Sequence, residues 1–265
     1  FFGVFALSFL LLLQIYVLKI LIYECFIWSN KFLMVTQQKK INAAKLAITK
    51  ITSGMNIGLG TGSTANELIK LLGDNPVLKD KCRFACTSTQ TELLAKNNSI
   101  HIEEIDNFNY LDLTIDGADE IDYNGNMIKG GGGALLREKM IASISKNYII
   151  IVDETKYVDK LGKFPLPVEI VKFGPKSTIT LLKNIFSEYD LYPEIKIRMN
   201  DNGSHFNTDG GNLVVDCYCA ELHSLNEIKT KIESVPGVIT SGLFINLASS
   251  MILGEKEKAS EVLFK

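Results

Sequence analysis

The sequence has few of the residues that most often hold metals or form disulfides. Its 265 residues include three histidines and five cysteines. The cysteines are odd in number, and the spacings in CRFAC and CYC fit neither a zinc pair with two intervening residues nor a disulfide framework. We therefore expect buried free thiols in a reducing compartment, the cytoplasm. His101, His205 and His223 are scattered along the chain, which argues against a metal centre built on histidine or cysteine.

The chain also lacks a strong charge of either sign. Its 28 Lys and Arg residues against 30 Asp and Glu give a net charge of -2, and no basic run is present. Binding to a nucleic-acid backbone needs clustered Lys and Arg, so a nucleic-acid partner is not expected. With 46% hydrophobic residues, the chain has enough material for a sizeable core in one large or two modest domains.

Residues 1–33 differ from the rest because they are almost continuously apolar. The segment is long enough to cross a bilayer, but Gln14, Lys19 and Glu24 interrupt it. It has no basic segment in front and no evident small-residue cleavage site. We interpret it as upstream translation that does not belong to the domain, and a targeting peptide or a membrane anchor remains the alternative. Met34 then opens a sequence typical of a soluble domain.

From residue 37 onward, short apolar runs alternate with amphipathic segments. This alternation predicts a doubly wound, mostly parallel, Rossmann-like α/β sheet. The expected strands cover residues 55–59, 83–86, 100–102, 113–115 and 148–152. The expected helices cover residues 37–51, 63–72, 90–97 and 135–145.

The pattern changes after Leu161, where LGKFPLPVE brings two prolines. Strands are expected at residues 168–173, 194–199 and 212–218, and helices at 177–189 and 222–234. The order βαββα indicates a smaller α+β domain of the ferredoxin-like kind, inserted over residues 163–235. Strands over 238–245 and 251–253 are expected to return to the first sheet. Residues 34–162 and 236–265 would then form the α/β catalytic domain.

The first of three glycine-containing motifs is GLGTGSTA, residues 58–65, between an expected strand and an expected helix. Glycines let the backbone turn tightly and approach an anion, and Thr61, Ser63 and Thr64 add hydroxyl groups at the start of the helix. The motif predicts a phosphate site. A loose dinucleotide pattern and an ordinary strand-to-helix turn are alternatives. No lysine follows the last glycine, which removes the phosphate-loop NTPase interpretation.

The second motif, IDGADEID, concentrates carboxylates. Asp116 lies at an expected strand end, where open α/β sheets bind ligands, and Asp119, Glu120 and Asp122 follow it closely. Carboxylates this close disfavour one another's ionised forms, so one could hold a proton and take part in acid–base chemistry. A magnesium site and a solvated acidic turn are the alternatives.

The third motif, KGGGGALLREK, places Lys129 before four glycines and a helix. Lys129 and the glycine amides could stabilise an oxyanion. Glu138, about one turn into the helix, is expected to stay ionised at neutral pH, as a general base must. The ordinary alternatives are a surface charge for Lys129 and an ion-pair partner on an exposed helix face for Glu138.

In this order and wording, the three motifs resemble those of type A ribose-5-phosphate isomerases. The resemblance extends to LGKFPLPVE and PGVITSGLF and covers essentially all of the chain from Met34. It implies an aldose–ketose isomerase of the non-oxidative pentose phosphate pathway, which interconverts ribose 5-phosphate and ribulose 5-phosphate through an enediolate without metal or cofactor. It also implies a homodimer or a dimer of dimers.

The resemblance further assigns roles to single residues. It implies that Glu138 moves the carbon protons and that Lys129 and the glycine amides hold the enediolate oxygens. Asp116, supported by Asp119, is expected to move the proton at the ring oxygen and hydroxyls. Its implied substrate contacts are Thr61, Gly62, Ser63, Thr64, Asp116, Gly117, Ala118, Asp119, Lys129, Gly130, Gly131, Gly132, Lys156 and Lys40. The sequence departs from the family pattern at Gly133 and Leu136, which are commonly alanine and threonine.

Three other functions remain open on the sequence alone. A sugar-phosphate deaminase or a CoA transferase could use a similar sheet, and would need an acid for nitrogen or a nucleophilic carboxylate. A sugar-phosphate sensor would bind without turnover, which Glu138 beside the glycines argues against. A membrane-attached module would rest wholly on residues 1–33.

Overall fold

The computed structural model describes residues 34–264. Residues 34–38 fall in a compact unit separate from residues 39–265, and residues 39–264 carry the sheets and the helices packed on them. The apolar segment 1–33, with Cys25 and the question of an anchor or targeting peptide, lies outside the described residues. In the part that is described, no helix is long and apolar enough to cross a membrane. Cys82, Cys86, Cys217 and Cys219 are free thiols.

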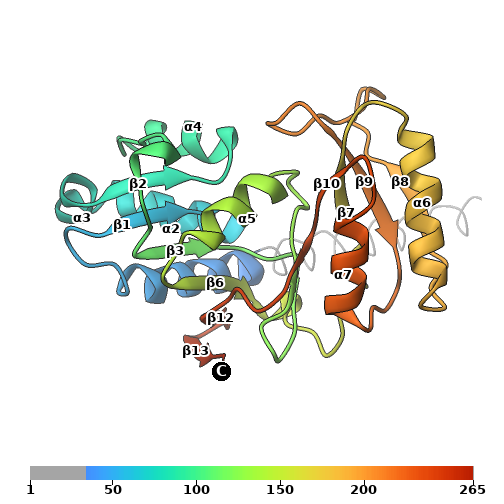
Figure 1. Cartoon of the computed structure of the whole chain (residues 1–265). Helices are drawn as coiled ribbons and strands as arrows, with labels where there is room; N and C mark the ends of the chain where they lie inside the picture. The colour runs from blue at the N-terminus through green and yellow to red at the C-terminus, as the bar shows by residue number, and fades with distance from the viewer. Residues whose placement is uncertain (1–33, 265) are drawn as a thin grey trace, which may run out of the picture. The chain divides into compact units, whose positions relative to one another are not determined.

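A six-stranded sheet carries the larger part of the fold (Figure 1). Its strand order is β13-β12-β6-β3-β1-β2, and every neighbouring pair is parallel except β12 and β13 at one edge. The strands are β1 (Asn56–Leu59), β2 (Arg83–Cys86), β3 (Leu113–Asp116), β6 (Tyr148–Asp153), β12 (Ser250–Gly254) and β13 (Ala259–Leu263). The predicted doubly wound, mostly parallel sheet is confirmed.

Helices cover both faces of this sheet because its strands are apolar on both sides. Ile151 of β6 shares a hydrophobic cluster with Ala47 of the first helix and Leu68 of α2. The neighbouring Ile150 points to the opposite face and shares a different cluster with Leu135 of α5. The helices are the first helix (residues 34–48), α2 (Ser63–Gly73), α3 (Pro76–Lys81), α4 (Thr89–Asn97) and α5 (Leu135–Ser143).

Two local predictions in this region differ from the structure. The strand expected at residues 100–102 is reduced to one isolated bridge between Phe84 and Ile102. The short helix α3 was not predicted. It begins because the Asn75 side chain accepts a hydrogen bond from the amide of Leu78 at 3.1 Å and Pro76 occupies the first helical turn, where no backbone donor is needed.

A second, antiparallel sheet belongs to the insertion between β6 and β12. Its order is β10-β7-β9-β8, and α6 and α7 accompany it (Figure 1). We call this part, from β7 to β10, the inserted unit. Its elements are β7 (Leu166–Ile170), α6 (Pro175–Ser187), β8 (Glu194–Ile197), β9 (Leu213–Tyr218), α7 (Leu225–Glu233) and β10 (Val238–Ser241). The order βαββαβ with this pairing is the ferredoxin-like arrangement.

The prediction that residues 238–245 return to the first sheet is wrong. Val238–Ser241 pairs with β7 and supplies the fourth strand of the inserted unit. Leu243–Phe244 (β11) pairs with Met127–Ile128 (β5) in a small third sheet that also contains Glu120–Ile121 (β4). An apolar run in the sequence predicts a strand. The sheet that this strand joins depends on which other strands still have an unpaired edge. Only β12 and β13 return to the parallel sheet.

The third sheet connects the inserted unit to the glycine motif that starts at Lys129. β11 follows β10 directly after Gly242, and the amide of Lys129 donates to the carbonyl of Gly242 at 2.9 Å. A side chain at residue 242 would lie 2.3 Å from the Lys129 carbonyl, so a glycine is required here. The backbone of Lys129 is therefore fixed by a segment more than a hundred residues away.

Candidate active site

The site lies where the chain order in the sheet reverses. β1 is flanked by β2 on one side and β3 on the other, and ligands of open α/β sheets bind at the carboxyl ends of the strands at such a point. A cavity of about 130 Å³ occupies this position. The residues that line it are Thr61, Gly62, Ser63, Thr64, Gly117, Ala118, Asp119, Lys129, Gly130, Gly131, Gly132, Glu138, Asp153 and Lys156.

One wall of the cavity is the amino end of α2. Gly62 precedes the helix with φ of 128°, a conformation that favours glycine, and no side chain caps the helix start. The first amides of a helix have no partner within it, and they attract anions together with the helix dipole. Ser63 is exposed and Thr64 is buried in this first turn. The four predicted phosphate residues, Thr61 to Thr64, are thus brought together.

Behind this wall, the Thr61 hydroxyl belongs to a cluster that was not predicted from the sequence. Its Oγ1 lies 2.7 Å from Thr87 Oγ1, 2.8 Å from Ser88 Oγ and 2.9 Å from Thr91 Oγ1. These three residues follow β2, beside the carboxyl end of β1. The run TSTQT after an apolar strand was a visible signal for them. The cluster holds the Thr61 side chain in one position.

The floor of the site is Asp116, which is fully buried at the end of β3. Its Oδ1 accepts from the amides of Thr61 at 3.0 Å and Gly117 at 2.7 Å. Its Oδ2 accepts from the hydroxyl of Tyr148 at 2.9 Å. A Cβ at residue 60 would lie 2.2 Å from Oδ1, so Gly60 is needed for β1 and β3 to meet here. Asp116 does not line the cavity, and its substrate contact stays a prediction.

Lys129 lies between two buried carboxylates. Its Nζ is 3.0 Å from Asp116 Oδ2 and 3.0 Å from Glu138 Oε1, and it donates to the carbonyl of Gly117. Burial alone would lower the pKa of Lys129, but Asp116 and Glu138 outweigh it and raise that pKa above its usual value. The lysine is therefore a fixed cation, and the surface-charge interpretation is wrong because only 2% of it is exposed.

Glu138 is buried, and it reaches the cavity from the first turn of α5. Burial raises its pKa to about 8, Lys129 acts in the opposite direction, and Asp116 adds to the increase. The expectation that Glu138 stays ionised throughout the neutral range is therefore wrong. The sequence predicted that Glu138 lies near the start of a helix, but it could not show that α5 is packed deeply enough to bury this carboxylate. Among the described residues, Glu138 Oε2 has no hydrogen-bond partner, so one oxygen remains available to a ligand.

The four carboxylates of IDGADEID fall into two sets: Asp116 and Asp119 belong to the active site, and Glu120 and Asp122 bond to the surrounding structure. Asp119 lines the cavity beside the glycines, and its Oδ2 accepts from the amide of Gly131 at 2.7 Å. Glu120 accepts from the amides of Gly162 and Phe164, both at 2.7 Å, and Asp122 closes a turn with Asn126. Glu120 and Asp122 are therefore structural, and among the described residues no group of three or more His, Cys, Asp or Glu side chains could hold a metal ion.

The cavity is closed by residues that follow β6. Lys156 lines it, as predicted, from a 3-10 turn at Glu154–Lys156. Asp153 also lines it and was missed, although it ends an apolar strand as Asp116 does. Lys40 is not part of the lining, and its substrate contact stays a prediction. Its neighbour Lys39 instead pairs with Glu154 at 2.5 Å.

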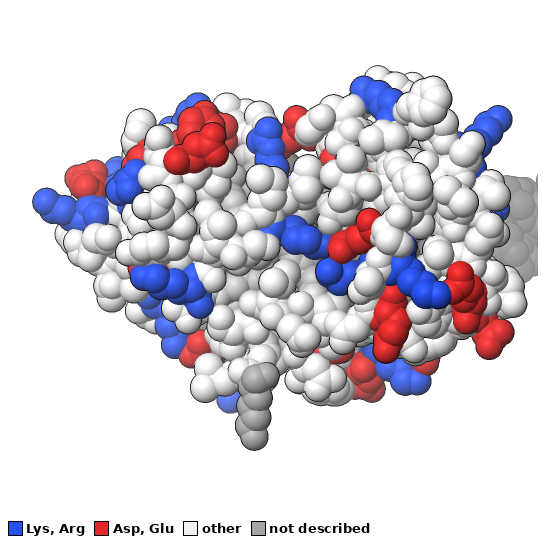
Figure 2. Space-filling model, in the orientation of Figure 1, with Lys and Arg blue, Asp and Glu red and all other residues white. Residues whose placement is uncertain are grey.

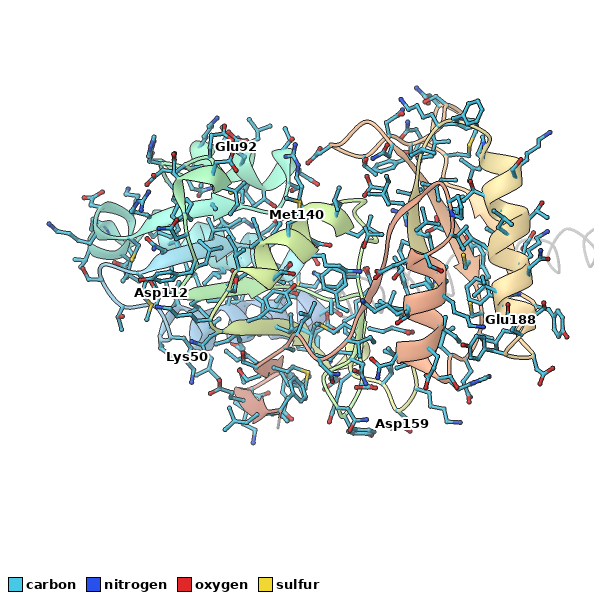
Figure 3. All side chains as sticks on the ribbon, in the orientation of Figure 1. Lys50, Glu92, Asp112, Met140, Asp159 and Glu188 are labelled. Atoms are coloured by element: carbon cyan, nitrogen blue, oxygen red, sulfur yellow. The ribbon has the colours of Figure 1, made fainter. Side chains whose placement is uncertain are left out.

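A second cavity, of about 210 Å³, shares no lining residue with the first. Glu92 of α4 and Met140 of α5 are on its wall, and both side chains are labelled in Figure 3. Its carboxylates are exposed or paired, as in Arg83 with Glu103. On the face drawn in Figure 2, basic and acidic residues are interspersed, with no extended basic surface.

Comparison with known proteins agrees with this geometry. The family model described as "Ribose 5-phosphate isomerase A (phosphoriboisomerase A)" matches residues 83–258. The chain is 40% identical to a ribose-5-phosphate isomerase A of Rhodopseudomonas palustris over 217 residues, which are 82% of this chain and 94% of that protein. It is similar to the structure of ribose 5-phosphate isomerase from Plasmodium falciparum, with a TM-score of 0.79, 36% identity, and coverage of 86% of this chain and 98% of the other.

A further solved structure is that of a D-ribose-5-phosphate isomerase in complex with phospho-erythronic acid. Its TM-score is 0.79 at 36% identity, with coverage of 85% of this chain and 97% of the other. Three similarities, to a family, a sequence and a fold, therefore converge on one assignment. The chain belongs to the ribose 5-phosphate isomerase A family.

Proposed function

We propose that this protein interconverts ribose 5-phosphate and ribulose 5-phosphate through an enediolate, as part of the non-oxidative pentose phosphate pathway. Family membership supports the reaction. The observation that carries the mechanism is the position of Glu138. It is a buried carboxylate with one free oxygen at the cavity wall, 3.0 Å through its other oxygen from a buried lysine.

Glu138 acts as the base and then as the acid. In the open-chain aldose, its ionised carboxylate removes the proton from C2, the C–H electron pair forms the C1–C2 double bond, and the C1–O1 π pair moves onto O1. A proton then passes from O2 to O1, the charge on O2 forms the C2 carbonyl, and C1 takes the proton back from Glu138, which gives the ketose. A base works best when its pKa lies near the operating pH, so a pKa raised by burial to about 8 suits this role.

The negative charge that develops on O1 and O2 meets Lys129 and the glycine amides. Lys129 is a cation at the cavity wall, and donors fixed in advance stabilise charge without reorganising. Asp116 holds this lysine at 3.0 Å but lies behind it. Asp119 lines the cavity, so it is the better placed of the two to exchange a proton with the ring oxygen and hydroxyls.

The phosphate end is bound at the start of α2 by the amides and hydroxyls of Ser63 and Thr64. Lys156 adds positive charge from the opposite wall. The phosphate dianion of the substrate then lies at the amino end of α2, where the free amides and the helix dipole favour a negative charge. The phosphate does not react, so these contacts contribute binding and orientation.

The activity is tested by supplying ribose 5-phosphate alone. We expect conversion to ribulose 5-phosphate with no second substrate. A deaminase or CoA transferase would need a nitrogen-bearing or acyl co-substrate, and a sensor would bind without turnover. Either result would contradict the proposal.

We further propose that the reaction needs no metal, because the positive charge that stabilises the enediolate oxygens comes from the ammonium group of Lys129. Activity should survive exhaustive chelation. Recovery that depends on added magnesium or zinc would assign Asp116 and Asp119 to a metal instead.

We also propose that the protein acts in the cytoplasm as a homodimer or a dimer of dimers. The four free thiols among the described residues agree with a reducing compartment. The assembly follows from the family resemblance, and light scattering of the purified protein would measure it.

A further inference from the structure

Arg198 links the inserted unit to the glycine loop of the active site, residues 130–133. It follows β8 directly, and its guanidinium reaches out of the inserted unit. Its Nη1 donates to the carbonyl of Gly130 at 2.9 Å and to the carbonyl of Gly131 at 2.9 Å. Neither the family motifs nor the cavity lining includes this residue. Through this side chain the inserted unit hydrogen-bonds to the loop.

The guanidinium is itself held firmly. Its Nε and Nη2 donate to the two carboxylate oxygens of Asp216 on β9, at 2.9 and 2.5 Å. The backbone of Arg198 is fixed as well, because its amide donates to Val214 at 2.8 Å and its carbonyl accepts from Phe206 at 2.9 Å. The side chain is only 14% exposed. A two-pronged pair of this kind fixes direction as well as distance.

The direction of the two carbonyls determines where the next two amides point. A trans peptide is planar, so its N–H and C=O point in opposite directions. With the Gly130 carbonyl on Arg198, the Gly131 amide must point away from it, and it does so toward Asp119 at 2.7 Å. The same reasoning applies to the Gly131 carbonyl and the Gly132 amide. Within the described residues, the Gly132 amide has no acceptor, and Gly132 lines the cavity.

We propose that Arg198 is a positioning residue that orients the Gly132 amide toward the enediolate oxygens and the Gly131 amide toward Asp119. The inserted unit is then part of the catalytic apparatus, although Arg198 itself does not touch the substrate. This inference rests on the proposed isomerase function. Glycines have no side chain to hold a loop, and the loop's own backbone bond, from the Gly133 amide to the Gly130 carbonyl at 2.9 Å, leaves the Gly131 carbonyl to be oriented from outside.

The test compares Arg198→Gln and Arg198→Lys with Arg83→Gln. Arg83 is a matched control because it also forms a two-pronged pair, with Glu103 at 2.8 and 2.6 Å, and donates to a carbonyl, that of Asn107 at 3.2 Å. It lies outside the cavity lining. We expect kcat of Arg198→Gln to fall by about 10- to 100-fold, toward the loss seen when an oxyanion donor is removed, with KM within roughly threefold.

Arg198→Lys keeps the charge beside Asp216 but cannot reach all four acceptors, so it should recover part of kcat. If Arg198→Gln does not fold, Arg198→Lys alone decides, and we expect a loss of kcat of more than about threefold in it. A kcat within about threefold of the Arg83→Gln protein, in a folded Arg198 variant, would overturn the proposal.

A binding measurement separates this inference from the proposed function. Phospho-erythronic acid carries a carboxylate where the enediolate charge would develop, and inorganic phosphate does not. Arg198→Gln should weaken binding of phospho-erythronic acid by about tenfold or more and leave inorganic phosphate unchanged. Equal effects on both probes would overturn the loop role. If the wild-type protein fails to convert ribose 5-phosphate, the proposed function falls, and the two probes still decide the role of Arg198.

Discussion

The two halves of the cavity differ in burial. Asp116, Lys129 and Glu138 form a buried cluster in which 4% or less of each residue is exposed. At the other end, the start of α2 presents Gly62 and Ser63 to solvent and has no capping side chain. Burial shifts pKa values and strengthens charge interactions, whereas an open helix end can bind and release an anion. We therefore propose that the chemical step depends on the buried half and substrate affinity on the exposed half.

The largest effect on activity is expected from Glu138→Gln, in the buried half. Glutamine keeps the shape of glutamate but cannot accept a proton. We expect kcat to fall by about 10²- to 10⁴-fold with little change in affinity for phospho-erythronic acid. Steady-state kinetics would measure it. Glu261→Gln is the control, because Glu261 also pairs with a lysine, Lys50, but lies on β13 outside the cavity. Near-normal kcat in Glu138→Gln would move the base role to Asp119 or Asp116.

The pH dependence of the activity should be set by the buried half of the cavity. In the proposed mechanism Glu138 is active as the ionised base, and its pKa is raised to about 8, so we expect activity to be lost as the pH falls below that value. We expect kcat/KM to rise about tenfold per pH unit from pH ~6.5 to ~8 and to level above it. The Ser63→Ala protein should keep the same profile. A flat profile over this range would show that no buried carboxyl limits the reaction.

Tyr148→Phe should weaken the buried cluster without touching the cavity. Burial, and then Asp116, raise the pKa of the Tyr148 hydroxyl well above its usual value, so it remains a donor to Asp116. Removing a donor to a buried carboxylate should lower the free energy of unfolding by about 1.5–3 kcal/mol. Loosening Asp116 also loosens Lys129, so kcat should fall roughly tenfold.

Urea unfolding and kinetics would measure both effects. Tyr123→Phe is the matched control, because the Tyr123 hydroxyl also donates to a carboxylate, that of Asp159, but at the surface. Figure 3 shows Asp159 at the edge of the molecule. The same loss of stability in both variants would contradict the importance of burial.

The smallest effects should come from the exposed half. Ser63→Ala and Thr64→Ala each remove one hydroxyl from the proposed phosphate site, and the charge of a phosphate hardly changes during the reaction. We expect KM to rise by roughly three- to tenfold with kcat within about twofold. A loss confined to kcat would mean that this end takes part in the chemical step, and the division between the two halves would fail.

How much was predictable depends on distance along the sequence. That Thr61–Thr64, Lys129 and Glu138 lie at one cavity could be predicted because glycines, hydroxyls and charges stand next to one another in GLGTGSTA and KGGGGALLREK. Tyr148 and Arg198 were not predicted, because each meets the site only through strand pairing or through the inserted unit. No local pattern marks such contacts.

The fold shows the same limit. The parallel sheet was predicted from alternating strands and helices, whereas the pairing of β10 depends on the free edge of β7. The raised pKa of Glu138 also depends on packing, because the sequence places it on a helix but does not say that α5 buries it. The sequence predicted which helix or strand carries a residue such as Asp116 or Glu138, but it did not predict how deeply that residue is buried.

The most direct test of the central claim, that Glu138 moves the carbon proton, is hydrogen exchange with solvent. Ribose 5-phosphate in deuterated water, followed by proton NMR, reports exchange at C2 separately from net conversion. We predict that the wild-type protein exchanges the C2 proton, and that in Glu138→Gln this exchange slows by about 10²- to 10⁴-fold while the variant still binds phospho-erythronic acid. Exchange at the wild-type rate in Glu138→Gln would contradict the account.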